Sequence, residues 1–470
     1  MSDYAKYVGE EDQSLRSGSG KSYNSKYVYG AVLNATMGAF FFGYVMSAFN
    51  PISEYIRHGA FPEEVPETLH NLMTSFVPLG AGVGALSAGK IASSIGRKKL
   101  MIVLDLICII GTVLTLVPSP YSLVFGRLIQ GYCVGANSSL VPLYINEVSP
   151  KEIGGTLGTG NQLLITIGVL IPPVLAVIGN PKSDYYRVIL AGAGVSPIIR
   201  LLGTLLAFNH ETPKYLVSIG KDEEARQVLT KLYTDGRAEE ELQGLKRQKD
   251  LEAESGKLTM KDIFSPKYKL RLVIGIMVAV FQQLSGINAI ILFSNKIFGE
   301  ENGNLYTMIM DILQILGTIV AGMIIERLGR KSLLVNGMAS IAIILGLFGV
   351  ISFINNESGV LKYLIWGYIL AFGLSIGPIP WVYIADILPD IAIGIAVLGN
   401  WASTFLISLL FPIISKPTAL GMGGGIMVFA VCSVLGAIYF MIYVKETKGK
   451  TEAEISAMFS KETQLTTSFE

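Results

Sequence analysis

Residues 91–98 read IASSIGRK, and a near copy, IIERLGRK, occupies residues 324–331. Gly329 follows Gly96 by 233 residues. Two motifs that repeat at nearly one spacing indicate that the chain consists of two duplicated halves. The second motif recurs at a spacing of 239 residues: Tyr144, Glu147, Pro150, Gly155 and Asn161 match Tyr383, Asp386, Pro389, Gly394 and Asn400.

Each half contains six long apolar stretches. In the first half they cover about 27–50, 70–95, 100–118, 121–148, 154–178 and 186–208, and in the second about 270–298, 304–326, 332–354, 361–388, 391–415 and 421–444. A helix of roughly 20 mostly apolar residues crosses a bilayer. The sequence therefore predicts an all-α integral membrane protein whose twelve transmembrane helices form two six-helix pseudo-repeats.

The overall composition supports a membrane protein and excludes several other classes. Apolar residues make up 51% of the chain and charged residues 16%, where about 25% charge is usual in soluble proteins. The net charge of +1 provides no field for holding nucleic acid. Because Cys108, Cys133 and Cys432 all lie in apolar stretches, no disulfide framework, metal site or cofactor is implied. We also find no arrangement of nucleophiles or acids typical of an enzyme.

Polar segments divide the chain into five parts. The expected order is a tail at 1–26, a six-helix bundle at 27–208, linker helices at 209–269, a second bundle at 270–444 and a tail at 445–470. Lys and Arg are enriched in the connections that share a side with both tails, and such cationic flanks are retained in the cytosol. We therefore expect both tails and the helical linker to be cytosolic.

Seven segments together resemble the sugar porter family of the major facilitator superfamily, and in particular its facilitative hexose transporters. The resemblance runs from the first span to residue 452, and it implies the major facilitator fold, alternating access and a functional monomer. The segments are Gly126-Arg127, 142–150 (PLYINEVSP), 211–216 (ETPKYL), 282–288 (QQLSGIN), 377–381 (GPIPW), Asn400-Trp401 and 446–449 (ETKG).

Neutral amides within the spans are the candidate sugar ligands. A sugar ring presents hydroxyl groups on all sides, and amides both donate and accept hydrogen bonds. Helical spacing lets at least one of Gln282 and Gln283 share a face with Asn288. By resemblance, Gln314 falls where many relatives have Asn. The expected substrate-binding residues are Gln162, Gln282, Gln283, Asn288, Gln314, Trp381 and Asn400. The alternative is that the amides only join helices, each contributing about 0.6 kcal/mol.

Span 1 bears on whether transport is passive. In proton-linked sugar porters its Gly-Tyr pair is commonly followed by Asp, but Val45 follows Gly43 and Tyr44 here and cannot titrate. The resemblance therefore implies a uniporter. Asp105 is expected to form a structural intramembrane pair with Arg127, and together with Asp311 it keeps a proton-coupled alternative open.

A cytoplasmic charge network is also implied by the resemblance. Arg97 with Glu147, and Arg330 with Asp386, match positions that hold the inner helix ends together when the cytoplasmic side is closed. Gly154 stands where an Arg normally follows the Pro150 motif. We therefore expect a weaker inner latch.

The function expected from the sequence is facilitative transport of a hexose, D-glucose, across the plasma membrane, with an internal membrane as the alternative. Its partners are the hexose and the lipid bilayer. Two other functions stay open: a proton-coupled symporter for a sugar or inositol, and a sugar-sensing receptor. An N-glycosylation sequon begins at Asn356 in an expected exoplasmic loop.

Overall fold

The computed structural model describes residues 23–150, 152–180, 183–234, 236–254, 260–299, 302–355, 359–450, 454–455 and 457–459. Within these ranges the secondary structure is helical, and an isolated bridge between Tyr23 and Tyr233 is the only β-type pairing. The sequon at Asn356 lies outside the described residues. The all-α prediction is confirmed.

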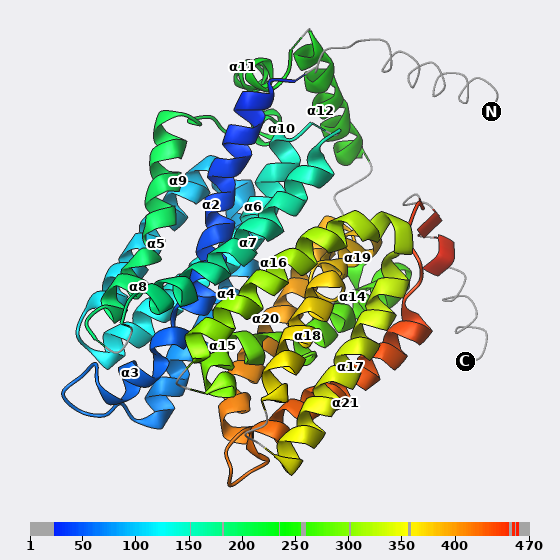
Figure 1. Ribbon diagram of the computed structural model, residues 1–470. Helices are drawn as coiled ribbons and strands as arrows, with labels where there is room; N and C mark the ends of the chain where they lie inside the picture. Colours follow the sequence, from blue (N-terminus) through cyan, green and yellow to red (C-terminus); the bar gives the residue numbers. More distant parts are fainter. Residues whose placement is uncertain are drawn as a thin grey trace.

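The helices form two bundles that lie side by side (Figure 1). The first contains α2 (Ser25–Ala48), the short η1 (Asn50–Ile52) and α3 (Ser53–His58), α4 (Glu67–Ile95), α5 (Arg97–Leu116), α6 (Pro120–Val148), α7 (Gly154–Ile178), α8 (Tyr186–Gly192) and α9 (Val195–Leu206). The second contains α14 (Pro266–Leu284), α15 (Ile287–Phe298), α16 (Gly303–Leu328), α17 (Arg330–Ile354), α18 (Val360–Leu374), α19 (Ile379–Ile387), α20 (Asp390–Ile414) and α21 (Gly421–Tyr443).

Eleven helical segments of the described chain are long and apolar enough to cross a membrane. The twelfth predicted span is α6, which has 29 residues and is long enough. Its polar side chains, among them buried Arg127, Gln130 and Asn137, lower its mean hydropathy. These side chains are buried inside the protein rather than facing lipid, and each forms at least one hydrogen bond there. The twelve-helix arrangement therefore agrees with the sequence.

Two spans of the second bundle are broken near their middle. Span 10 ends as α18 at Leu374 and resumes as α19 at Ile379, where Pro378 and Pro380 remove backbone donors. Span 7 differs from the continuous helix expected between Gln282 and Asn288. Gly286 adopts a left-handed φ of +93° between α14 and α15, a conformation that glycine adopts without steric cost.

The linker helices α10 (Pro213–Ser218), α11 (Asp222–Leu232) and α12 (Arg237–Glu254) belong structurally to the first bundle. Their buried Val217, Leu229 and Leu242 join its hydrophobic core. The short α13 (Met260–Ile263) packs against α14 instead. The predicted boundaries of the linker, at residues 209 and 270, stay a prediction. The last helix of the first bundle, α9, ends at Leu206, and the first helix of the second bundle, α14, begins at Pro266.

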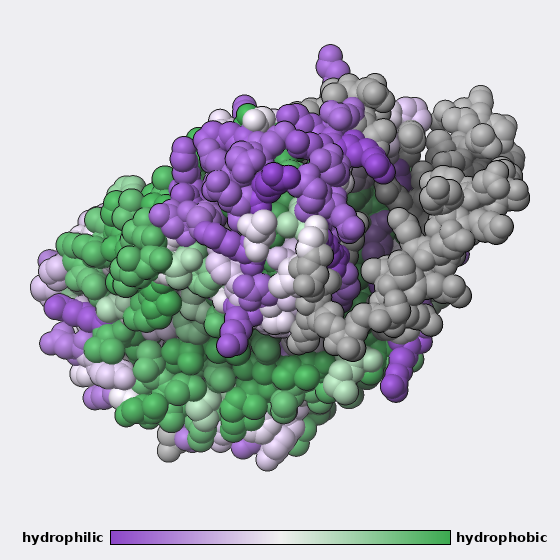
Figure 2. All heavy atoms as spheres, turned by 90° about the horizontal axis from the view of Figure 1, so that it is seen from above, coloured by the Kyte–Doolittle hydropathy of each residue, from purple (hydrophilic) through white to green (hydrophobic). Residues whose placement is uncertain are grey.

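We call the end of the bundles beside α10–α12 the linker end. Figure 2 views the molecule from this end, where hydrophilic side chains gather over the linker helices. Hydrophobic surface covers the flanks in Figure 2. The large apolar side chains that are exposed include Val83, Ile110 and Phe125. Because such side chains would be costly to hydrate, this distribution fits a protein whose flanks contact lipid and whose linker end contacts water.

Glycines allow the helices of the first bundle to pack closely. A Cβ on Gly84 of α4 would lie 2.0 Å from the Tyr132 carbonyl oxygen, and one on Gly135 of α6 would lie 1.8 Å from the Ala81 carbonyl oxygen. Backbones can approach this closely only where small residues face each other. Gly84 and Gly135 therefore permit the close packing of α4 against α6.

Candidate functional site

The first amide group of the candidate site forms around the break in span 10. Gln282 Nε2 donates to the carbonyl oxygens of Ile376 (3.0 Å) and Gly377 (2.9 Å), two acceptors that the helix break leaves without helical donors. Asn400 Nδ2 in turn donates to Gln282 Oε1 at 2.8 Å. Gln282 and Asn400 therefore tie α14 and α20 to the break in span 10.

The second amide group lies at the break in span 7. Asn288 Nδ2 donates to Gln283 Oε1 at 2.5 Å and to Thr404 Oγ1 at 3.3 Å. The left-handed Gly286 turns the chain between the two amides, so they meet across a break rather than along one helix. The structure thus brings Gln283 and Asn288 together, as the sequence predicts, by a geometry that the sequence did not reveal.

The remaining candidate ligands occupy three other helices. Gln314 of α16 is buried, and its Oε1 has no hydrogen-bond partner among the described residues. Trp381 of α19 is partly buried against the core of the second bundle. Gln162 of α7 is partly buried in the first bundle. Gln314 thus keeps an acceptor available in a place where an unpaired polar atom is costly.

The two bundles contact each other near the end opposite the linker. Asn50 Nδ2 donates to Ser294 Oγ at 2.6 Å, and the Asn295 backbone N–H donates to Asn50 Oδ1 at 3.4 Å. Thr307 Oγ1 donates to Ser294 Oγ at 2.8 Å. We call Asn50, Ser294, Asn295 and Thr307 the inter-bundle cluster. It joins η1 to α15 and α16, and sequence reasoning missed it.

Two further contacts join the bundles. Lys416 Nζ lies 2.6 Å from Glu67 Oε1, at the same end as the inter-bundle cluster. Deeper in the molecule, the ring of Phe42 on α2 lies 5.4 Å from that of Trp401 on α20. Polar contacts therefore join the two bundles at the end opposite the linker, and an aromatic contact joins them deeper in the molecule.

The expected charge pairs lie at the linker end, and each connects two helices of one bundle. Arg97 Nη2 of α5 lies 2.7 Å from Glu147 Oε1 of α6, with both side chains nearly buried. Arg330 Nε of α17 lies 3.4 Å from Asp386 Oδ2 of α19. The structure thus forms both pairs, and their role in gating stays a proposal.

A third carboxylate completes each charge group, and sequence reasoning gave it no role. Glu211 Oε1 accepts the backbone N–H groups of Arg97 (2.8 Å) and Lys98 (3.0 Å) at the start of α5. The carboxylate of Glu446 accepts those of Arg330 (2.9 Å) and Lys331 (3.0 Å) at the start of α17. An acid at a helix N-terminus satisfies free donors and complements the helix dipole.

The threonines that follow these acids complete the repeat. Thr212 Oγ1 donates to Glu147 Oε2 at 2.6 Å, and Thr447 Oγ1 donates to Asp386 Oδ2 at 2.7 Å. The Glu-Thr pair at 211–212 recurs at 446–447, so the same internal duplication that identified the two halves could have revealed these contacts.

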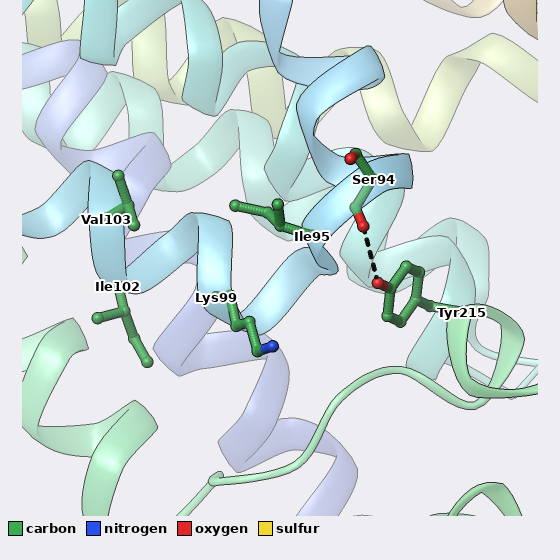
Figure 3. A pocket seen from close by; sticks show the side chains of 6 residues that line it. All are labelled: Ser94, Ile95, Lys99, Ile102, Val103 and Tyr215. Atoms are coloured by element: carbon green, nitrogen blue, oxygen red, sulfur yellow. Dashed lines mark hydrogen bonds between the residues drawn. The ribbon is translucent and has the colours of Figure 1, made fainter. Parts of the chain in front are cut away.

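A shallow hollow of about 480 Å³ opens beside the first charge group (Figure 3). Tyr215 lines it and donates from its hydroxyl to the Ser94 carbonyl oxygen at 3.1 Å. The other lining residues are Ile95, Lys99, Ile102 and Val103. Since all of these residues belong to α4, α5 and α10, the hollow lies on one bundle and not between the two, and it lacks the amides of the candidate site.

The predicted pairing of Asp105 with Arg127 is wrong. Asp105 pairs with Arg200 of α9, whose Nη2 lies 2.7 Å from Asp105 Oδ1. Arg200 Nη1 also donates to Asn137 Oδ1 at 2.6 Å. Opposite charge and the family resemblance suggested Arg127 as the partner, but span 6 carries its own arginine, Arg200, in a helix that packs against α5.

Arg127 is fully buried, and its guanidinium contacts two backbone carbonyl groups and an aromatic ring instead of Asp105. Its Nε donates to the Met73 carbonyl oxygen and its Nη1 to that of Val45, both at 2.9 Å. Its guanidinium lies 5.2 Å from the centre of the Phe49 ring. Backbone carbonyls and an aromatic face thus replace a carboxylate beside this charge.

The family follows from a comparison with family models. Residues 31–459 match the model described as sugar (and other) transporter. The chain belongs to this family. It is therefore a multi-pass membrane protein that transports sugars, and it is not an enzyme.

Two of the relatives that are similar in sequence to this chain are glucose transporters. The glucose transporter GlcP of Staphylococcus epidermidis is 34% identical over 402 residues, which cover 83% of this chain and 88% of the relative. The facilitated glucose transporter member 2 of solute carrier family 2 from Gallus gallus is 31% identical over 413 residues, covering 83% of this chain and 75% of that protein.

The fold is that of a solved transporter. The partially occluded inward-open conformation of the xylose transporter XylE from E. coli superposes with a TM-score of 0.79 at 26% identity, covering 91% of this chain and 100% of XylE. A second solved structure is that of XylE, described as a major facilitator superfamily proton:xylose symporter, bound to 6-bromo-6-deoxy-D-glucose. It superposes with a TM-score of 0.76 at 26% identity, covering 93% of this chain and 100% of XylE. The chain thus has the major facilitator fold.

Proposed function

We propose that this transporter carries a hexose, D-glucose, by passive uniport. The observation that carries the proposal is the convergence of amides on the two broken spans of the second bundle, with Gln314 Oε1 left without a partner among the described residues. Amides recognise hydroxyl groups without a net charge, so binding stays reversible. The sugar ligands we propose are Gln162, Gln282, Gln283, Asn288, Gln314, Trp381 and Asn400.

The broken spans supply the mobility that alternating access requires. Breaks at Gly286 and at Ser375–Pro378 free backbone groups, and the amides of Gln282 and Gln283 contact these breaks. A sugar that rearranges the amides can therefore shift both half-spans. Binding energy can change the balance between two states only if the ligand contacts them differently.

Passive transport is supported by the surroundings of Val45. Its carbonyl oxygen accepts a hydrogen bond from Arg127, and its side chain cannot carry a proton. The relative from Gallus gallus is described as a facilitated transporter, whereas XylE is described as a proton symporter. Symport is therefore the competing function, and it predicts accumulation driven by a proton gradient.

We further propose that the protein works as a monomer in the plasma membrane with the linker end in the cytosol. The density of Lys and Arg at that end supports this orientation. The inter-bundle cluster then lies on the exoplasmic side, and the described conformation is inward-facing. The charge groups around Arg97 and Arg330 lie at the cytosolic helix ends, and we propose that they contribute to closing that side.

Uptake of labelled D-glucose by proteoliposomes tests the substrate. Labelled L-glucose measures leakage, because a stereospecific site must discriminate between the two. Uptake of D-glucose that unlabelled D-glucose competes away and that Gln314→Leu reduces would support the proposed site. Equal rates for the two enantiomers would refute it.

A further inference from the structure

Asp311 is a buried acid without a visible partner. Its side chain is 1% exposed, and neither carboxyl oxygen has a hydrogen-bond partner among the described residues. Buried acids in membrane helices usually pair with a cation or with hydrogen-bond donors. An ionised carboxylate in such a place is strongly disfavoured, whereas a protonated carboxyl group carries no net charge.

Asp311 shares one face of α16 with a residue of the inter-bundle cluster and with a proposed sugar ligand. Thr307, Asp311 and Gln314 follow each other at spacings of four and three residues, so they lie on one face of the helix. Thr307 belongs to the inter-bundle cluster, and Gln314 is a proposed sugar ligand. Asp311 therefore lies about one turn from each, between the closed end and the sugar site.

Other titratable groups near α16 lie at helix ends or are neutral. The helices packed against α16 are α7, α15, α17 and α18. No titratable residue occurs in α7. Lys362 of α18 lies over the Tyr306 ring, 4.7 Å from its centre, and Tyr368 of α18 is buried. The rest lie in the terminal turns: Lys296 of α15, Glu326 and Arg327 of α16, Arg330 and Lys331 of α17, and Tyr363 of α18.

We propose that Asp311 is a proton-binding site filled from the exoplasmic side, and that its protonation permits the inter-bundle cluster to close. In the outward-open state, water reaches the carboxyl group and it ionises. Closure removes that water, so the carboxylate must first take up one proton. The described closed state contains the resulting carboxylic acid. This step rests on the orientation and alternating access given under the proposed function.

The burial of Asp311 also implies that its proton is not carried across the membrane together with the sugar. Asp311 is 1% exposed in the conformation closed at the exoplasmic end, and we infer that it does not release its proton toward the linker end. When the cluster opens again, the proton returns to the side from which it came. External pH therefore changes the rate of transport but leaves the final distribution of sugar unchanged.

The direct test measures the initial rate of D-glucose uptake into proteoliposomes as external pH is raised and internal pH is held constant. The wild-type rate should fall, by at most about tenfold per pH unit for one proton. Asp311→Asn, which mimics the neutral acid, should give a rate that external pH does not change. Glu63→Gln removes an exposed acid on the same side and should keep the wild-type profile.

A second measurement does not depend on sugar flux or on the folding of Asp311→Asn. In the otherwise wild-type protein, a cysteine replacing Ser294 is labelled from outside by an impermeant thiol reagent, and the rate is divided by that of a cysteine replacing exposed Glu64. The ratio should fall at low pH, because protonation favours closure.

Three results would overturn the proposal: a wild-type rate and labelling ratio that are both insensitive to external pH, an unchanged pH profile in Asp311→Asn, or sugar accumulation driven by an inward proton gradient. Absence of D-glucose flux at every pH would instead refute the proposed substrate, and the labelling ratio would then decide the role of Asp311.

Discussion

Arg200 and Asp105 form an ion pair inside the first bundle, with Nη2 2.7 Å from Oδ1 and neither side chain more than 1% exposed. Arg200 Nε also donates to both carboxyl oxygens, at 2.9 and 3.1 Å. The pair joins α5 to α9, and the bond from Arg200 to Asn137 adds α6. Three helices of one bundle are thereby held in register, as expected if each bundle moves as a rigid unit.

Removing one member of this pair should destabilise the protein strongly. Asp105→Asn leaves Arg200 buried without its counter-charge, and we expect a loss of roughly 3–5 kcal/mol in the free energy of unfolding. The midpoint of thermal unfolding of the purified protein in detergent reports the loss. Combining Asp105→Leu with Arg200→Met should recover much of it, because no charge is then left unpaired.

A double-mutant cycle distinguishes the observed pair from the pair expected from sequence. The coupling energy between positions 105 and 200 should be large, whereas Asp105→Asn and Arg127→Met should be nearly additive. Comparable coupling in the second cycle would contradict the assignment of Arg200 as the partner.

The cap at Glu446 should make stability depend on pH. Burial alone would raise the pKa of Glu446, but backbone N–H donors from Lys448, Arg330, Lys331 and Thr447 together hold it below its usual value. Its contribution is therefore present above the pKa of the unfolded chain and is lost as pH falls through the lower folded pKa. We expect Glu446→Gln to cost about 1 kcal/mol near neutral pH, since the group is partly exposed and solvent screens it.

Thermal unfolding of Glu446→Gln and wild type at several pH values tests this cap. The difference between them should shrink as pH falls through the folded pKa. Glu223→Gln at an exposed position of α11 is the control and should differ little from wild type. A difference that grows toward acid pH would show that the sign is wrong.

Weakening the inter-bundle cluster should open the molecule at that end. Asn50→Ala removes the hydrogen bond to Ser294, and about 1 kcal/mol should shift the balance between the two states roughly fivefold. A cysteine replacing Gln314 should then react faster with an impermeant reagent added outside.

Asn34→Ala is the matched control for the cluster. Asn34 Nδ2 donates to Thr204 Oγ1 at 2.9 Å within the first bundle, so its loss removes an amide bond without touching the interface. Equal labelling rates in Asn50→Ala and Asn34→Ala would argue against a gating role for Asn50.

Loss of a proposed sugar ligand should weaken binding without unfolding the protein. Gln283→Ala removes an amide whose Oε1 accepts a hydrogen bond from Asn288 Nδ2, and we expect the Kd for D-glucose to rise roughly tenfold. Equilibrium binding of labelled D-glucose measures this change. Asn336→Ala removes an exposed amide of α17 and should leave the Kd unchanged.

The sequence predicted the spans well because lipid imposes a simple rule on them. Twelve apolar stretches and the prolines near 378 lie in the sequence itself, and each acts locally. The break at Gly286 was not predicted, because one glycine between Ser285 and Ile287 carries no distinctive signal before its φ is known. Helical continuity was therefore assumed where the chain turns.

The polar contacts were harder to predict because their partners are far apart in sequence. Asn50 and Ser294 are separated by 244 residues, and Asp105 and Arg200 by 95. Composition identifies such side chains as costly in lipid, but only the packing of the helices decides which of them meet. Glu211 and Glu446 differ, since their duplication in the two halves is visible in the sequence.

Passive transport is the central claim, and the final sugar level in proteoliposomes tests it most directly. Labelled D-glucose is followed to its plateau with and without an imposed inward proton gradient. Passive uniport predicts that internal and external concentrations become equal in both conditions. A plateau above the external concentration that collapses with an uncoupler would contradict the claim and establish proton-coupled symport.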